Sequence, residues 1–169
     1  MAASAAALSA QTTRPFVESA ETHYYDFYVG RWLAVVDGRI DSTGTAFIVR
    51  RSVHPAAYEE DWVQRIDSVE HRSTALRAWD QIENRWMFTW ISGNALFQVW
   101  RGEKVGNDWY IVRDFDFEGQ KFVSRQAWIP EGPDRLVRVM ERSTDGGRTW
   151  QTRYRGVYQR VADRVEERR

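Results

Sequence analysis

The chain contains no cysteine, so it can form neither disulfide bonds nor zinc sites built on thiolates. Its formal net charge is zero, and only Lys104 and Lys121 among its basic residues are lysines. A balanced charge offers no electrostatic footprint for nucleic acid or for an anionic membrane surface. No apolar run approaches the roughly 20 residues that a membrane-spanning helix needs. We therefore expect a protein that binds neither nucleic acid nor membranes.

The common motifs of nucleophilic and phosphate chemistry are also missing. The chain has no Gly-x-Ser-x-Gly, no P-loop and no Gly-x-Gly-x-x-Gly, the patterns typical of hydrolase nucleophiles and of nucleotide phosphates. Its three histidines, His23, His54 and His71, lie in separate segments without the spacing of metal ligands. Surface or capping roles suit them better than zinc or haem ligation, so we expect no cofactor.

Aromatic residues are abundant, at 14% of the chain with nine tryptophans. Trp79, Trp86, Trp90 and Trp100 fall within Thr74–Arg101, three extended runs separated by turn residues. Aromatic and β-branched residues suit a pleated surface, and the apolar spacing here is not helical. The other runs of this kind are Thr45–Val53, Tyr58–Ile66, Trp109–Phe117, Lys121–Ile129, Arg135–Arg142 and Thr149–Val161. This regular series predicts a mainly β chain that forms a single antiparallel up-and-down barrel of about 8–10 strands.

The N-terminal part has a different character. Thr12–Phe27 carries apolar residues on one helical face, with Pro15 suited to a first turn, and predicts a short helix. Tyr25–Val36 then reads as a strand. Met1–Ala10 lacks the basic residues of a secretory signal, so we expect a frayed end and a cytoplasmic protein, with a trimmed signal remnant as the alternative. The predicted divisions are residues 1–22 as tail and helix, 23–163 as barrel and 164–169 as a charged tail.

The sharpest local motif lies near the C-terminus. Ser143–Trp150 reads S-T-D-G-G-R-T-W and resembles an Asp-box. That resemblance implies a hairpin turn in which Asp145 accepts backbone amide bonds while Trp150 packs beneath. A single copy favours a turn device over glycoside chemistry. In the following strand, Trp150, Tyr154 and Tyr158 should share one face by simple alternation.

The order of these motifs resembles a group of bacterial lipocalin-like proteins. Asp26–Trp32, D-F-Y-V-G-R-W, is similar to the Asp-Phe-Trp-x-Gly-x-Trp opening of that group, with Tyr28 in place of a tryptophan. The further matching segments are Glu60–Trp62, Ala78–Asp80, Arg85–Trp86 and Ser143–Trp150. The resemblance implies a calycin-type β-barrel with a central cavity, and it implies no particular activity.

Glu60 is the candidate for chemistry. A period of two places Tyr58, Glu60, Trp62, Gln64 and Ile66 on one strand face, and the apolar members indicate that this face points inward. Burial raises the pKa of carboxylic acids toward the range of general acids and bases. Glu60 is therefore a catalytic candidate. The alternative, which we favour, is a structural carboxylate bonded to an interior arginine or to the backbone.

Polar residues also interrupt strand faces that are otherwise aromatic, such as Gln98 before Trp100 and Gln126 before Trp128. Ligand cavities are built in this way, although a satisfied polar network inside a packed core gives the same pattern. Arg113 either reaches the barrel mouth or pairs with an interior carboxylate. The residues that we expect to bind a ligand are Trp62, Gln64, Trp90, Gln98, Trp100, Arg113, Ser124, Gln126, Trp128, Tyr154 and Tyr158.

Three functions remain open from the sequence. The first is binding of a small apolar, aromatic or polycyclic molecule; the second is a cofactor-free isomerase, cyclase or dehydratase that uses Glu60. The third is a structural or dimerisation module, because Trp86–Ile91 is apolar on both faces and needs cover from the N-terminal helix or from a second copy in a homodimer. Asp114, Asp116 and Glu118 suggest a solvated exterior face more than a calcium site, and we expect no metal.

Overall fold

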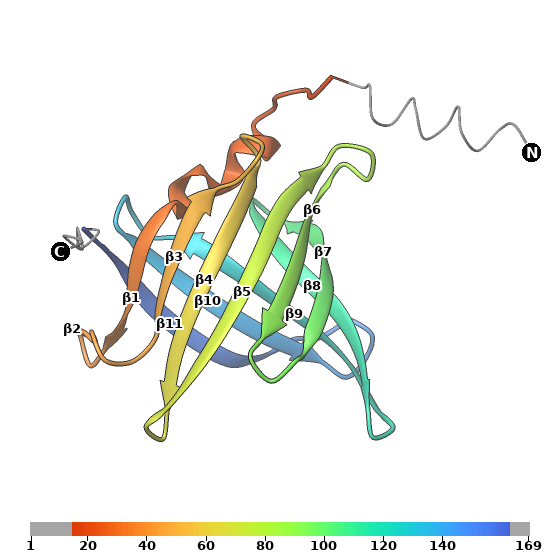
Figure 1. Ribbon diagram of the computed structural model, residues 1–169. Coiled ribbons are helices and arrows are strands. Elements are labelled where there is room, and N and C mark those ends of the chain that lie inside the picture. Colours follow the sequence, from red (N-terminus) through yellow and green to blue (C-terminus); the bar gives the residue numbers. More distant parts are fainter. Residues whose placement is uncertain (1–14, 163–169) are drawn as a thin grey trace, which may run out of the picture.

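The computed structural model describes residues 15–162, so Met1–Ala10 and the predicted charged tail 164–169 lie outside the described residues. It contains one short 3₁₀ helix, η1 (Glu21–Tyr28), followed by a continuous series of strands (Figure 1). The strands are β1 (Gly30–Val36), β2 (Arg39–Ile40), β3 (Ala46–Arg51), β4 (Ala57–Ile66), β5 (Val69–Asp80), β6 (Arg85–Ser92), β7 (Phe97–Val105), β8 (Asp108–Phe117), β9 (Gln120–Pro130), β10 (Arg135–Ser143) and β11 (Gln151–Val161).

The strands close into a barrel in which each one runs antiparallel to its neighbours. From β3 to β11 every strand pairs with the next along the chain, β1 pairs with β3, and β11 returns to pair with β1. β2 pairs only with β1, so the other ten strands form the closed up-and-down barrel seen in Figure 1. Closure leaves these ten strands without a free edge. The predicted fold class is confirmed.

Tight turns make this topology accessible to the chain. Asp37-Gly38, Asp67-Ser68 and Glu118-Gly119 are turn pairs in which both residues have positive φ. Such turns match the right-handed twist of the strands that they connect, and they favour glycine or short polar side chains.

The predicted N-terminal elements have different bounds in the structure. Pro15–Ser19 is not helical, and η1 starts at Glu21. Two reciprocal hydrogen bonds lie at this start: the Ser19 N–H donates to Thr22 Oγ1 at 3.0 Å, and the Thr22 N–H donates to Ser19 Oγ at 3.4 Å. The strand predicted from Tyr25 starts at Gly30, because Tyr25–Tyr28 belongs to the helix. No helix among residues 15–162 is long and apolar enough to cross a bilayer.

Helix η1 plugs one end of the barrel. Tyr25 and Tyr28 are fully buried there, and the Tyr25 ring meets the Trp86 ring edge-on at 4.9 Å between centroids. Glu21 fixes the helix start, because its carboxylate pairs with Lys104 and accepts a 2.6 Å hydrogen bond from Trp109 Nε1. The Lys104 hydrogen bond is the largest influence on the pKa of Glu21, which lies below its ordinary value although burial opposes the shift.

The two faces of β6 have different surroundings. Trp86 and Phe88 point into the barrel and are buried, whereas Ile91 lies on the outer face with 46% of its surface exposed. The expected cover by η1 therefore applies to Trp86 at the barrel end and not to the outer face. No described segment covers that outer face, and the homodimer remains a prediction.

The strand face predicted for the last hairpin is wrong for Trp150. The register of β10 and β11 shifts between Met140 and Glu141: Met140 pairs with Tyr154, but Glu141 pairs with Thr152. This bulge reverses the alternation. Trp150 packs against the guanidinium of Arg125 at 4.0 Å on the outer face, away from Tyr154.

Candidate ligand cavity

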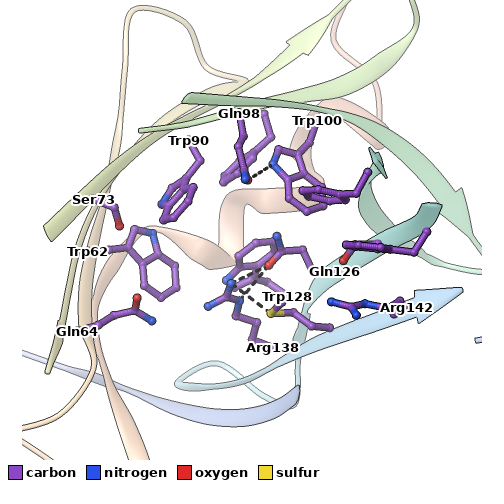
Figure 2. Close-up of a pocket in the computed structure, with 15 residues that line it drawn as sticks. Trp62, Gln64, Ser73, Trp90, Gln98, Trp100, Gln126, Trp128, Arg138 and Arg142 are labelled. Atoms are coloured by element: carbon purple, nitrogen blue, oxygen red, sulfur yellow. Dashed lines mark hydrogen bonds between the residues drawn. The ribbon is translucent and has the colours of Figure 1, made fainter. Parts of the chain in front are cut away.

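A cavity of about 320 Å³ occupies the half of the barrel away from η1 (Figure 2). Its wall comes from strand ends remote from the helix, such as Gln64 late in β4, Trp90 late in β6 and Gln98 early in β7. Helix η1 instead contacts Trp86 and Trp109, which lie at the starts of β6 and β8, away from the cavity ends of these strands. The end of the barrel beyond the cavity is therefore closed by η1 and the aromatic side chains that contact it.

Most of the predicted ligand-binding residues meet at this cavity. Those that line it are Trp62, Gln64, Trp90, Gln98, Trp100, Ser124, Gln126 and Trp128. The residues of the wall that sequence reasoning missed are Ser73, Phe88, Phe115, Phe122, Arg138, Met140 and Arg142. Seven of the fifteen lining residues are aromatic and seven are polar, and Gln126 and Arg138 are joined by hydrogen bonds, as Figure 2 shows.

Three of the predicted residues do not line the cavity. The guanidinium of Arg113 lies 5.1 Å from the Phe115 ring, and Phe115 itself belongs to the wall. The hydroxyls of Tyr154 and Tyr158 are 2.9 Å apart. Tyr158 is fully buried against Phe47, and burial raises the pKa of its hydroxyl well above the ordinary value.

Glu60 lies beneath the cavity rather than in its wall. Its side chain is fully buried, where Oε1 accepts a 3.0 Å bond from Arg77 Nε and Oε2 accepts bonds from the Tyr28 hydroxyl at 3.1 Å and Trp62 Nε1 at 3.0 Å. Arg77 Nη2 also lies 3.0 Å from Oε1, at an angle that makes it a charge contact and not a hydrogen bond. Every partner of Glu60 is thus another buried side chain of the protein.

Arg77 lies in an aromatic box. Its guanidinium carbon is 4.2 Å from the ring centre of Tyr25, 4.4 Å from Trp128, 5.0 Å from Phe88 and 5.3 Å from Tyr28. Burial alone would lower the pKa of Arg77, but the Glu60 carboxylate and the nearby tyrosines outweigh it and raise that pKa. The pair has no net formal charge, and the rings of Phe88 and Trp128 lie between Arg77 and the cavity.

Arg138 is the main polar feature of the wall. Its Nε and Nη2 donate to Gln126 Oε1 at 3.2 and 2.7 Å, and its guanidinium lies 5.2 Å from the rings of both Trp62 and Trp128. Arg142 lies further along the same strand face, 4.0 Å from the Phe122 ring. The sequence of β10 gave no indication of this orientation, since Leu136–Arg142 alternates no more clearly on one face than on the other.

The described residues contain no group of three or more acidic or histidine side chains arranged to hold a metal ion. His54 Nδ1 accepts the Ala56 N–H at 3.1 Å, as a turn residue would. Asp114 pairs with Arg101, and Asp116 lies 3.8 Å from Lys121, both on the outer surface.

A scan against protein-family models and a search of curated proteins found no match to this chain. The closed antiparallel barrel agrees with the lipocalin-like resemblance at the level of architecture. The resemblance to that particular group stays a prediction.

Proposed function

We propose that this protein binds a small, largely aromatic molecule inside its barrel. The observation that carries the proposal is the 320 Å³ cavity, whose wall combines seven tryptophan and phenylalanine rings with seven polar side chains. Small-molecule sites have this character and begin at about 300 Å³. A barrel that served only as a scaffold would need no such space, because protein interiors are otherwise close-packed.

The enzyme hypothesis has less support. It requires Glu60 to exchange protons with a bound molecule, and a general acid or base must come within hydrogen-bond reach of the reacting atom. Glu60 is fully buried, is paired with Arg77 and does not line the cavity. Binding needs no movement of this group, so we retain binding as the function.

The test uses N-phenyl-1-naphthylamine, an uncharged aromatic probe whose fluorescence increases in apolar surroundings. We expect saturable binding to the wild-type protein, together with quenching of tryptophan emission. The variant Ser73→Phe, which places a ring in the cavity wall, should weaken binding by tenfold or more, equivalent to about 1.4 kcal/mol.

The matched control is Thr89→Phe. Thr89 lies between two residues of the wall, Phe88 and Trp90, so its side chain points to the outer face of β6. This variant adds the same ring without filling the cavity, and its affinity should equal that of the wild type. No saturable binding by the wild type, or equal losses in both variants, would refute the proposed function.

A further inference from the structure

We infer that the ligand of the cavity is an organic acid, an aromatic molecule that carries a carboxylate or a similar oxyanion. The inference rests on the proposed function and adds the charge of the ligand to it. It starts from the ionisable residues of the wall, which are Arg138 and Arg142. No acidic side chain between residues 15 and 162 lines the cavity, so this part of the chain gives the wall only positive formal charge.

Neither arginine is neutralised by the protein. Among residues 15–162, no carboxylate forms an ion pair with Arg138 or Arg142. The one fully buried carboxylate among residues 15–162, Glu60, is already paired with Arg77. Both side chains are half-buried, so each arginine loses part of its hydration without gaining a counter-charge, and the ring contacts of Arg138 offset only part of that loss. A ligand oxyanion would complete the charge balance.

The hydrogen-bonding groups of the wall also favour an acceptor-rich ligand. Gln126 turns its carbonyl oxygen toward Arg138, which has only donors, and Gln98 turns its oxygen toward Trp100 Nε1 at 3.2 Å, another donor. The amide NH₂ group of neither glutamine donates a hydrogen bond to another of residues 15–162, and both residues line the cavity.

Arg138 is suited to hold an oxyanion in one orientation. Gln126 engages only its Nε and Nη2, whereas a guanidinium has five N–H donors in a planar fork. The Gln126 bonds and the flanking rings of Trp62 and Trp128 fix the plane of that fork. Guanidinium and oxyanion can then form charge-assisted, bidentate hydrogen bonds, while the aromatic part of the ligand lies among the tryptophans.

The experiment compares two probes that differ by one anionic group. 1-Anilinonaphthalene-8-sulfonate is N-phenyl-1-naphthylamine with an added sulfonate, so apolar binding alone favours the uncharged probe. We expect the sulfonate to bind wild-type protein at least tenfold more tightly than the uncharged probe. 2-Naphthoate should displace the bound sulfonate probe, and the neutral 2-naphthamide should not. This result would show that the cavity prefers carboxylates as well as sulfonates over uncharged ligands.

The variant Arg138→Met removes the charge and keeps an unbranched side chain. It should abolish the preference for the sulfonate, measured as the ratio of the two probes' dissociation constants for the same variant. Arg155→Met is the control, because it removes the same charge from an exposed position on β11, where Arg155 pairs with Glu131; the preference should remain. Arg142→Met provides a second test within the wall if Arg138→Met does not fold.

The outcomes separate the two proposals. Equal or weaker binding of the sulfonate by the wild type, with tight binding of the uncharged probe, would overturn the anion inference and leave the proposed function intact. Retention of the sulfonate preference in both Arg138→Met and Arg142→Met would also overturn it. Binding of neither probe would refute the proposed function, and the inference with it.

Discussion

The Glu60–Arg77 pair beneath the cavity should be among the most sensitive sites for stability. In Glu60→Gln the shape is kept, but the Arg77 charge loses its partner inside a fully buried aromatic box. Removing one member of a buried ion pair costs about 3–5 kcal/mol, because the other charge remains buried without compensation. Since single domains are stable by roughly 5–15 kcal/mol, this change should remove a large part of the free energy of unfolding.

Urea unfolding followed by tryptophan fluorescence measures this loss. Asp61→Asn is the matched control: Asp61 is the next residue on β4, faces outward and pairs with Arg50 at 2.6 Å, with 60% of its side chain exposed. Exposed pairs contribute about 0–1 kcal/mol, so that variant should stay within this range of the wild type.

The double variant Glu60→Gln/Arg77→Met distinguishes charge burial from simple loss of packing. If the penalty comes from the unpaired guanidinium, removing it should restore at least about 2 kcal/mol relative to Glu60→Gln alone. A Glu60→Gln loss below about 1 kcal/mol, or a double variant no more stable than the single one, would refute this reasoning. The same Glu60→Gln protein should bind the uncharged probe within about tenfold of the wild type, whereas loss of turnover with retained binding would revive the enzyme hypothesis.

Three further predictions concern the C-terminal hairpin. Asp145 accepts hydrogen bonds from the Arg148 and Thr149 N–H groups at 3.0 and 2.9 Å, and the bond from the Thr149 amide is the largest cause of its lowered pKa. Asp145→Ala should therefore lower the melting temperature without changing probe affinity. An unchanged melting temperature would contradict the turn role. Because the folded pKa lies below the unfolded value, this stabilisation is present above about pH 4 and is lost as the pH falls, so Asp145→Asn should show a shallower loss of stability between about pH 5 and pH 2. An equally steep loss would contradict this linkage. Gly156→Ala should also lower the melting temperature, since a Cβ there would clash with the Tyr154 hydroxyl, and affinity should stay within about threefold because neither residue lines the cavity; a fully stable Gly156→Ala protein would contradict it.

The strand alternation was sufficient to predict the barrel and much of the cavity wall. Where strands are regular, as in β4 and β9, a period of two places Trp62 and Gln64, or Gln126 and Trp128, on the inner face. The spacing of turn residues likewise predicted an up-and-down order. These features are local, and the backbone geometry of a strand makes them readable without knowledge of its neighbours.

The remaining features depend on pairing between distant strands. The sequence suggested an interior arginine as partner for Glu60, but Arg77 is identified only by the β4–β5 register, in which Glu60 pairs with Ala75 and Arg77 lies on the adjacent diagonal. The bulge opposite Met140 reverses the face of Trp150, and no residue there signals it. Arg138 was missed because the sequence of β10 does not show which of its two faces points inward.

The most direct test of the central claim uses the methionine methyl groups. The chain has three methionines, Met1, Met87 and Met140. Met140 lines the cavity, whereas Met87 lies between inward-facing Trp86 and Phe88 and therefore on the outer face of β6. In ¹³C-methyl NMR spectra, saturating N-phenyl-1-naphthylamine should shift the Met140 resonance and leave Met87 in place. A shift of Met87 alone, or of neither residue at saturation, would contradict a ligand inside the barrel.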